Sequence, residues 1–242
     1  MKNFRSLLKI SVVTFMMGCC SGAVSSVQTP APVHKTQEEL ISEKQVRIEK
    51  IKQTTVALVE KFEDRQIPVC AGVWVSNNMI LTAAHCLDSE IPIYTYATKD
   101  SFYANELKIA IEFSKDTDHD LALLIADPQT LEKHPTAIVS NVDLMSGDEM
   151  DIVGHTMGLP WSYSHGFVSE TRENITGPLG PSEKMIQISS PVWMGNSGGG
   201  AFDRVGNLAG ICSWVISSGP DLSFFVHRDV IQKFLISEFA KL

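Results

Sequence analysis

The chain has 242 residues, with 20 lysines and arginines against 28 aspartates and glutamates, which gives a formal charge of −8 at pH 7. This acidic balance argues against a nucleic-acid-binding protein, which would need a basic surface. With 44% hydrophobic and 20% charged residues, the composition excludes a mainly disordered or fibrous chain and fits one or two globular domains.

Residues 1–20 have the pattern of an export signal. Lys2, Arg5 and Lys9 precede a short apolar run at 10–17, and this run is about half the ~20 residues that span a bilayer. The residues at 16–19 are similar to a bacterial lipoprotein processing site, which would leave Cys19 lipidated and the protein anchored to a membrane. The alternative is cleavage after Ala23, which would release a soluble protein. In both cases we expect the protein to be exported, to the periplasm or outside the cell.

The segment at 21–53 is expected to connect this signal to the folded domain. Its first part, 21–35, is rich in serine and proline and is typical of a flexible tether. A capping-box pattern then begins at Thr36, and up to about Lys52 charged residues alternate with aliphatic ones. This pattern predicts a surface helix that leads into the domain.

From Thr54 onward the sequence consists of short β-branched runs between turn residues, with no internal repeat. Many short strands at this spacing indicate an all-β barrel or sandwich. The helical spacing of apolar residues at 230–242 predicts a helix that closes the domain. The predicted strands are 54–62, 72–75, 79–82, 107–113, 121–125, 150–153, 166–169, 185–188, 200–202, 208–215 and 223–226.

The strongest chemical signal is the turn Gly-Asn-Ser-Gly-Gly-Gly at 195–200. A serine is a weak nucleophile unless a base lies beside it and hydrogen-bond donors stabilise the oxyanion that it creates. The glycines on both sides of Ser197 allow a tight turn whose backbone N–H groups point at one spot. Alone, such a glycine-rich segment can be no more than a turn.

A histidine and an aspartate elsewhere in the chain could complete this chemistry. His85 follows an apolar strand, and a disulfide between Cys70 and Cys86 could pin the loop that carries it. Asp120 directly precedes another apolar strand, where its carboxylate could accept the Nδ1 proton of the histidine and fix the tautomer. Asp118 is the alternative, two residues further from the strand.

Together these segments resemble the trypsin/chymotrypsin-like serine peptidase family, in its chain order of histidine, aspartate and serine. The matching stretches are TAAHC at 82–86, DLALL at 120–124, GNSGGG at 195–200 and GICSW at 210–214. Within the family, the segments at 151–160 and 166–169 are similar to the bacterial HtrA-type branch. The resemblance covers about residues 54–240.

The resemblance implies two antiparallel six-stranded β-barrels, near 54–135 and 136–228, within a protease domain at 54–242. The active site would lie in the cleft between the barrels. The implied activity is that of a serine endopeptidase that forms an acyl-enzyme with polypeptide substrates and uses no cofactor or metal. The alternative from another class is a catalytically silent relative that binds peptides.

The resemblance also implies a role for each matched residue. Ser197 would attack the carbonyl carbon, His85 would accept and return the proton, and Asp120 would orient His85. The backbone N–H groups of Gly195 and Ser197 would form the oxyanion hole. The cysteine spacing is similar to that of the family's disulfide near the histidine, which favours the pair Cys70 and Cys86.

Substrate recognition is expected along the segment at 213–215. Ser213 and Trp214 match the strand that pairs with the substrate backbone in this family. Val192, Val215 and Phe224 are expected to line the specificity pocket, which predicts a small or medium apolar residue on the acyl side of the cut.

Several residues depart from the digestive members of the family. Pro191 stands where trypsin-like pockets hold the acid that selects arginine or lysine. Asn196 replaces the aspartate that pairs with a newly cut N-terminus, so we expect no activation by such a cut. No PDZ module is evident after the domain, in contrast to most HtrA-type enzymes.

Four further residues are expected to have structural roles. Cys212 lies in an apolar strand and is expected to be a buried, unreactive thiol. His119, His155 and His165 lack the spacing of metal ligands and are expected in loops or in the core.

Overall fold

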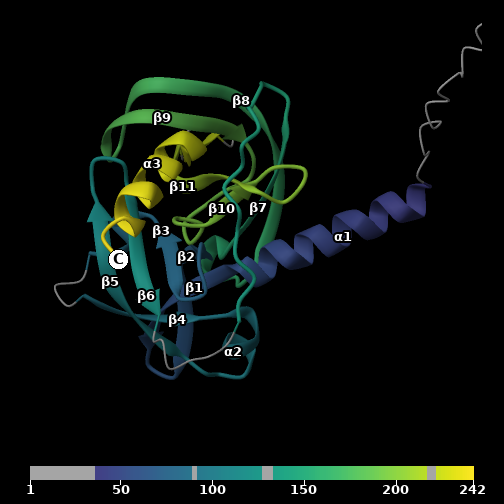
Figure 1. Ribbon diagram of the computed structural model, residues 1–242. Coiled ribbons are helices and arrows are strands. Elements are labelled where there is room, and N and C mark those ends of the chain that lie inside the picture. Colours follow the sequence, from purple (N-terminus) through teal and green to yellow (C-terminus); the bar gives the residue numbers. More distant parts are fainter. Residues whose placement is uncertain (1–35, 89–91, 127–132, 217–221) are drawn as a thin grey trace, which may run out of the picture. The chain divides into compact units, whose positions relative to one another are not determined.

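The computed structural model describes residues 36–88, 92–126, 133–216 and 222–242. The described chain forms two closed antiparallel β-barrels of six strands each, with helices before the first barrel and after the second (Figure 1). This confirms the predicted fold class. The predicted export signal, the lipidated Cys19 and the tether lie outside the described residues.

The first barrel is closed by strands in the order β1, β2, β3, β6, β5, β4. Their bounds are β1 (Thr55–Phe62), β2 (Arg65–Trp74), β3 (Met79–Thr82), β4 (Ile93–Ala97), β5 (Lys108–Asp116) and β6 (Leu121–Ala126).

The second barrel is closed in the order β10, β11, β12, β9, β8, β7. Its strands are β7 (Glu149–Gly154), β8 (Ser162–Gly177), β9 (Gly180–Ser189), β10 (Gly200–Phe202), β11 (Leu208–Ile216) and β12 (Leu222–His227).

Strands β3 and β6 of the first barrel are apolar on both faces, and each face packs into a different core cluster. Ile80 and Leu124 belong to the core cluster that fills the first barrel. Their neighbours Leu81 and Leu123 point the other way, into a cluster that also contains Val153 of the second barrel. The two-residue period of a strand therefore joins the barrels through one shared apolar layer.

The helices are α1 (Gln37–Thr54), α2 (Lys99–Tyr103) and α3 (Arg228–Phe239), and short 3₁₀ turns lie at Ala84–Cys86 (η1) and Thr156–Gly158 (η2). Only the end of α1 is buried, at Ile51 and Thr54. Helix α3 packs on the second barrel (Figure 1). None of the described helices is long and apolar enough to cross a membrane.

The predicted strands differ most from the observed ones at four places. Strand β4 was not predicted at all, and β2 begins at Arg65 rather than at residue 72. Strands β8 and β9 are much longer than the apolar runs at 166–169 and 185–188. The extra length of β8 and β9 is a polar hairpin in which Glu173 pairs with Lys184. Strand pairing stabilises this hairpin without an apolar face, so the hydrophobic pattern could not reveal it.

Candidate active site

His85 and Asp120 contact each other directly. Nδ1 of His85 lies 3.0 Å from each carboxylate oxygen of Asp120, and the backbone N–H of His85 also donates to this carboxylate at 3.0 Å. Because a carboxylate only accepts, Nδ1 must carry the proton, which leaves Nε2 of the neutral ring as an acceptor. The contact therefore selects the tautomer that a general base needs.

Asp120 is held by its own backbone and by the second barrel. Its φ is +53°, in the left-handed region that aspartate tolerates better than most residues. The hydroxyl of Ser213 on β11 donates to Oδ2 of the Asp120 carboxylate at 2.5 Å. From the sequence, Ser213 was expected only on the strand that binds substrate. The contact of its side chain with Asp120 was not predicted. Asp118, the alternative carboxylate, is exposed.

The turn that carries Ser197 is held against the first barrel. The backbone N–H of Ala71 on β2 donates to the carbonyl of Ser197 at 2.7 Å. Gly198 has a φ of +78°, and a Cβ there would lie 2.2 Å from the carbonyl oxygen of Ala71. A glycine is thus required for this close approach.

The backbone amides on either side of Asn196 are available as donors. The N–H groups of Gly195 and Ser197 have no backbone acceptor among the described residues. Gly195 has a φ of +90°, and a Cβ there would lie 2.2 Å from the carbonyl oxygen of His155. This conformation can direct two converging N–H groups at one developing negative charge.

The 3₁₀ turn η2 also holds the turn that carries Ser197 through hydrogen bonds. The side-chain amide of Asn196 donates to the hydroxyl of Thr156 at 2.8 Å and to the carbonyl of Trp193 at 2.9 Å. The N–H of Met157 donates to the carbonyl of Met194 at 2.7 Å. The contact between Thr156 and Asn196 could not be predicted from the sequence, because the two residues are 40 positions apart.

His155 connects this segment to the first barrel. It is fully buried, its Nδ1 accepts from the N–H of Trp161 at 3.1 Å, and its Nε2 lies 3.1 Å from the carbonyl of Val56. Since a carbonyl only accepts, Nε2 carries the proton and the ring is neutral. Burial lowers the pKa of His155 to about 4. His155 thus has a core role.

Cys70 and Cys86 form a disulfide that joins β2 to η1, where His85 lies. In the described part of the chain, these two sulfurs and a ring nitrogen of His85 are the one group with the spacing of metal ligands, within 4.8 Å of one another. Because the disulfide uses both sulfurs, the group offers no thiolates to a metal.

The segment expected to bind substrate has one unpaired edge. Strand β10 pairs with β11 only as far as Ile211, so the edge of β11 beyond this residue, including 213–215, has no partner on that side among the described strands. The indole of Trp214 stacks on Phe224 at a centroid distance of 3.8 Å. Gly177, at the end of β8, leaves room for this indole, because a Cβ there would lie 2.5 Å from it.

The residues expected around the specificity pocket differ in their exposure. Val192 is buried, Val215 is half-buried and packs against the core of the second barrel, and Pro191 is exposed. Cys212 is buried beside them, and burial raises the pKa of its thiol. A protonated, buried thiol is a poor nucleophile.

His119 and His165 each contact carboxylates other than Asp120. Nδ1 of His119 lies 2.7 Å from Asp116, and its Nε2 lies 3.3 Å from Glu183 on β9. His165 lies 3.0 Å from the buried carboxylate of Asp151. Neither belongs to a metal-ligand cluster of the described residues.

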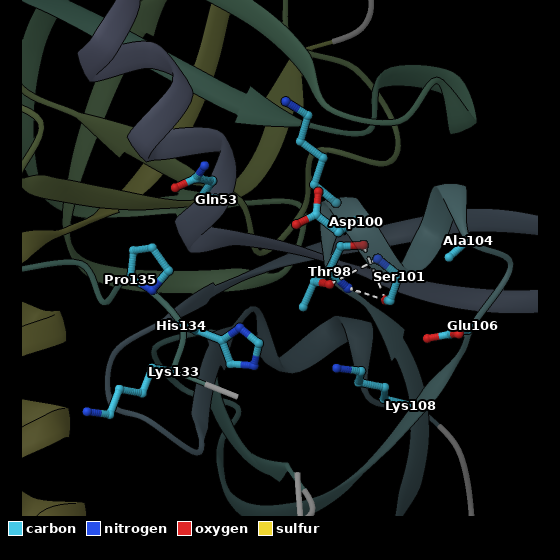
Figure 2. A pocket seen from close by; sticks show the side chains of 11 residues that line it. Gln53, Thr98, Asp100, Ser101, Ala104, Glu106, Lys108, Lys133, His134 and Pro135 are labelled. Atoms are coloured by element: carbon cyan, nitrogen blue, oxygen red, sulfur yellow. Dashed lines mark hydrogen bonds between the residues drawn. The ribbon is translucent and has the colours of Figure 1, made fainter. Parts of the chain in front are cut away.

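A cavity of about 550 Å³ lies beside α2. Figure 2 shows Lys108, Lys133 and His134 around the start of this helix, where Thr98 and Ser101 cap it through reciprocal bonds. None of the site residues predicted from the sequence lines this cavity. A second cavity, of about 510 Å³, has His85 in its wall.

The family described as "Trypsin-like peptidase domain" matches residues 70–211. The chain is 27% identical over 158 residues to "Protease Do-like 1, chloroplastic" of Arabidopsis thaliana, a match that covers 63% of this chain and 35% of that protein. It is 34% identical over 112 residues to the "Probable periplasmic serine endoprotease DegP-like" of Brucella suis, covering 42% of this chain and 21% of that protein. The chain thus spans about a third or less of the length of these relatives.

Two solved structures support the two-barrel fold. The HtrA-type protease AlgW with a decapeptide is 20% identical, with a TM-score of 0.69 over 80% of this chain and 66% of that one. The serine endoprotease from Yersinia pestis is also 20% identical, with a TM-score of 0.64 over 85% of this chain and 67% of that one.

Proposed function

Because the chain belongs to the trypsin-like peptidase family, we propose that it is a serine endopeptidase whose reaction is carried by Ser197, His85 and Asp120. The observation that carries this proposal is the bond from Nδ1 of His85 to the Asp120 carboxylate. It leaves Nε2 as the base for the serine hydroxyl.

In the first half of the reaction, Oγ of Ser197 attacks the carbonyl carbon of the scissile bond while Nε2 of His85 takes the hydroxyl proton. The carboxylate of Asp120 stabilises the imidazolium that forms. As the C–N bond breaks, His85 gives the proton to the leaving amine, and the acyl chain stays on Ser197. Water then attacks the ester with His85 again as the base, which releases the acid and restores the serine.

The N–H groups of Gly195 and Ser197 stabilise the oxyanion in both halves of the reaction. The support for this role is that both lack a backbone acceptor in the described chain. Removal of one such donor costs ~3 kcal/mol of transition-state stabilisation in other enzymes, so the backbone conformation at Gly195 matters as much as the side chains.

The substrate pairs its backbone with the unpaired edge at 213–215, where Ser213, Trp214 and Val215 lie. This mode of binding tolerates many sequences. Val192 and Val215 give the pocket an apolar character, so cleavage is expected after small or medium apolar residues. A peptide-library digest with cleavage mainly after arginine, lysine or glutamate would contradict this.

The protein is exported in this proposal, as the name of the DegP-like relative states for that protein. Residues 1–20 act as the signal, 21–53 as tether and helix, and 54–242 as the protease domain. The mature chain is either lipidated at Cys19 or begins at Val24. Mass spectrometry of the mature N-terminus distinguishes the two forms.

A fluorophosphonate probe tests the activity directly. We expect the wild-type protein to be labelled, and Ser197→Ala to abolish the labelling because the probe reacts only with an activated serine. The matched control Ser146→Ala removes an exposed hydroxyl in a loop and should be labelled like wild type. Absence of labelling in the folded wild-type protein would favour the peptide-binding alternative.

A further inference from the structure

The cavity that includes His85 is bounded by three strands of the first barrel. It measures about 510 Å³, and β1, β2 and β4 supply its wall together with the disulfide. Leu58 and Val59 form a buried apolar part of the lining. Val69 and Ile93 also line it, yet they are 36% and 52% exposed.

Val69 enters the cavity because β2 is irregular there. Leu58 pairs with Cys70 and the next residue, Val59, pairs with Pro68, so Val69 has no partner on β1. Such a bulge inserts one extra residue and redirects a side chain, and bulges are frequent beside active sites. The protein therefore keeps an apolar side chain exposed in the same cavity wall as His85, where a substrate side chain could cover it.

The position of His85 shows which part of a substrate would reach this cavity. His85 returns its proton to the leaving amine, so the residue that follows the cleaved bond must lie against the imidazole. The cavity has that imidazole in its wall. In addition, Val69 is two residues from Ala71, whose N–H holds the carbonyl of Ser197 at 2.7 Å.

The charges at the cavity are acidic. Among the described lining residues, Glu60 and Asp88 are acidic and none is a lysine or an arginine. The side chain of Asp88 is 80% exposed and lies 3.5 Å from the ammonium of Lys115. An acidic side chain in the cavity would meet like charge and lose its hydration, whereas an aliphatic one would cover Val69 and Ile93.

An apolar surface continues from the cavity past Ser197. Ile67 precedes Val69 on the same face of β2, and a Cβ on Gly158 would lie 3.5 Å from it. The neighbouring Met157 and Met194 are 61% and 66% exposed and are joined by a backbone bond of 2.7 Å. Methionine side chains adapt to apolar partners of different shape, so this surface suits varied residues further along the leaving chain.

We infer that this cavity is the binding site for a large apolar side chain on the first residue after the cleaved bond. The substrates are then polypeptides with leucine, isoleucine, methionine or phenylalanine at this position, and acidic residues are rejected. This inference rests on the proposed function and names the substrate class of that same site.

The test compares quenched fluorescent peptides that share one acyl side and carry leucine, lysine or aspartate directly after the cut. For the wild-type protein we expect kcat/KM to be at least about tenfold higher for leucine than for aspartate, the range in which one apolar pocket discriminates. Ile93→Lys should reduce this ratio at least about tenfold, since it adds a cation to the cavity. The matched control Ile236→Lys, on α3 at a side chain that is 65% exposed, should keep the wild-type ratio.

Equal rates for leucine and aspartate in the wild-type protein, or an unchanged ratio in Ile93→Lys, would overturn the inference while leaving the peptidase assignment intact. Analytical ultracentrifugation at rising protein concentration tests whether a second copy of the chain, rather than a substrate, covers the apolar surface. A dimer that Ile93→Lys disrupts, combined with equal peptide rates, would show that it does and would overturn the inference. Absence of both cleavage and Ser197-dependent labelling would remove the proposed function itself.

Discussion

A hydrogen bond between two uncharged side chains, Thr156 and Asn196, holds the turn of Ser197. In the digestive members of the family, an aspartate at the position of Asn196 forms an ion pair with a newly cut N-terminus instead. Asn196 is only 1% exposed, so its amide depends on protein partners. Its two bonds, to Thr156 and to the carbonyl of Trp193, hold the peptide units that carry the proposed oxyanion donors. These bonds hold the turn through groups inside the described chain and involve no chain terminus.

Replacement of Thr156 by valine keeps the shape of the side chain and removes the hydroxyl. We expect kcat for a peptide substrate to fall about tenfold with little change in KM, because in the proposed mechanism the Gly195 and Ser197 amides act on the transition state. Thr156→Ser restores the hydroxyl and should recover most of the rate. Steady-state kinetics measure both, and a valine variant with the wild-type kcat would show that Thr156 does not position the turn.

His155 makes stability depend on pH. Its pKa is about 4 in the folded protein and near 6.5 when unfolded, so below pH 6.5 the unfolded chain takes up a proton that the folded chain does not. The stabilisation is complete above pH 6.5 and is lost as the pH falls towards 4, at up to ~1.4 kcal/mol per pH unit.

In His155→Gln, the amide can accept from Trp161 and donate to Val56 without titrating in this range. The free energy of unfolding, measured in urea at several pH values, should fall less steeply from pH 6.5 to 4.5 than in wild type. Equal slopes for the two proteins would mean that His155 does not carry this dependence.

At the residue level, the sequence identified the residues next to regular strands and missed those defined by distant contacts. His85 and Asp120 could be chosen because each directly adjoins an apolar strand, and Ser197 because glycines surround it. The side-chain roles of Ser213 and Thr156 depend on partners 93 and 40 positions away. No local pattern encodes such contacts.

At the level of elements, α1 is attached to the second barrel mainly at its C-terminal half. Arg47 donates from Nε to the buried carboxylate of Asp151 on β7 at 2.9 Å. Tyr163 and His165 also contact this carboxylate. Burial by itself raises the pKa of Asp151, but these hydrogen bonds together with Arg47 outweigh it and hold the pKa below its ordinary value.

Arg47→Met keeps the length of the side chain but leaves the Asp151 carboxylate without its cation. We expect a loss of about 2 kcal/mol in the free energy of unfolding, less than for a fully buried pair because Arg47 is partly exposed. Chemical denaturation measures the loss, and limited proteolysis should cut within α1 earlier than in wild type. Lys44→Met changes an exposed cation on the same helix and should do neither.

Among the elements, the strands that are apolar on both faces and the closing helix were predictable, whereas β4 and the polar ends of β8 and β9 were not. The buried strands β3 and β6 were found within one residue of their ends, because both faces are apolar. The polar ends of β8 and β9 have no such signal, and their length depends on pairing with each other.

At the level of the whole molecule, the disulfide closes a loop within the first barrel. Cys70 and Cys86 are 16 residues apart, and a cross-link over a loop of this size stabilises a fold by ~3 kcal/mol in the chain-entropy model. The double variant Cys70→Ala/Cys86→Ala should lose about this amount in urea denaturation. Wild type under a dithiol reductant should shift to the same midpoint, and equal stability with and without the bond would contradict the prediction.

Two bonds cross between the barrels at the candidate active site, and they run in opposite directions. Ser213 of the second barrel holds Asp120 of the first, and Ala71 of the first holds Ser197 of the second. A substitution at one of these four positions therefore affects the active-site residue of the other barrel. A recombinant that took one barrel from a distant relative would fold around a similar interface yet lose turnover, unless the incoming half brought its own hydroxyl or amide to the matching position.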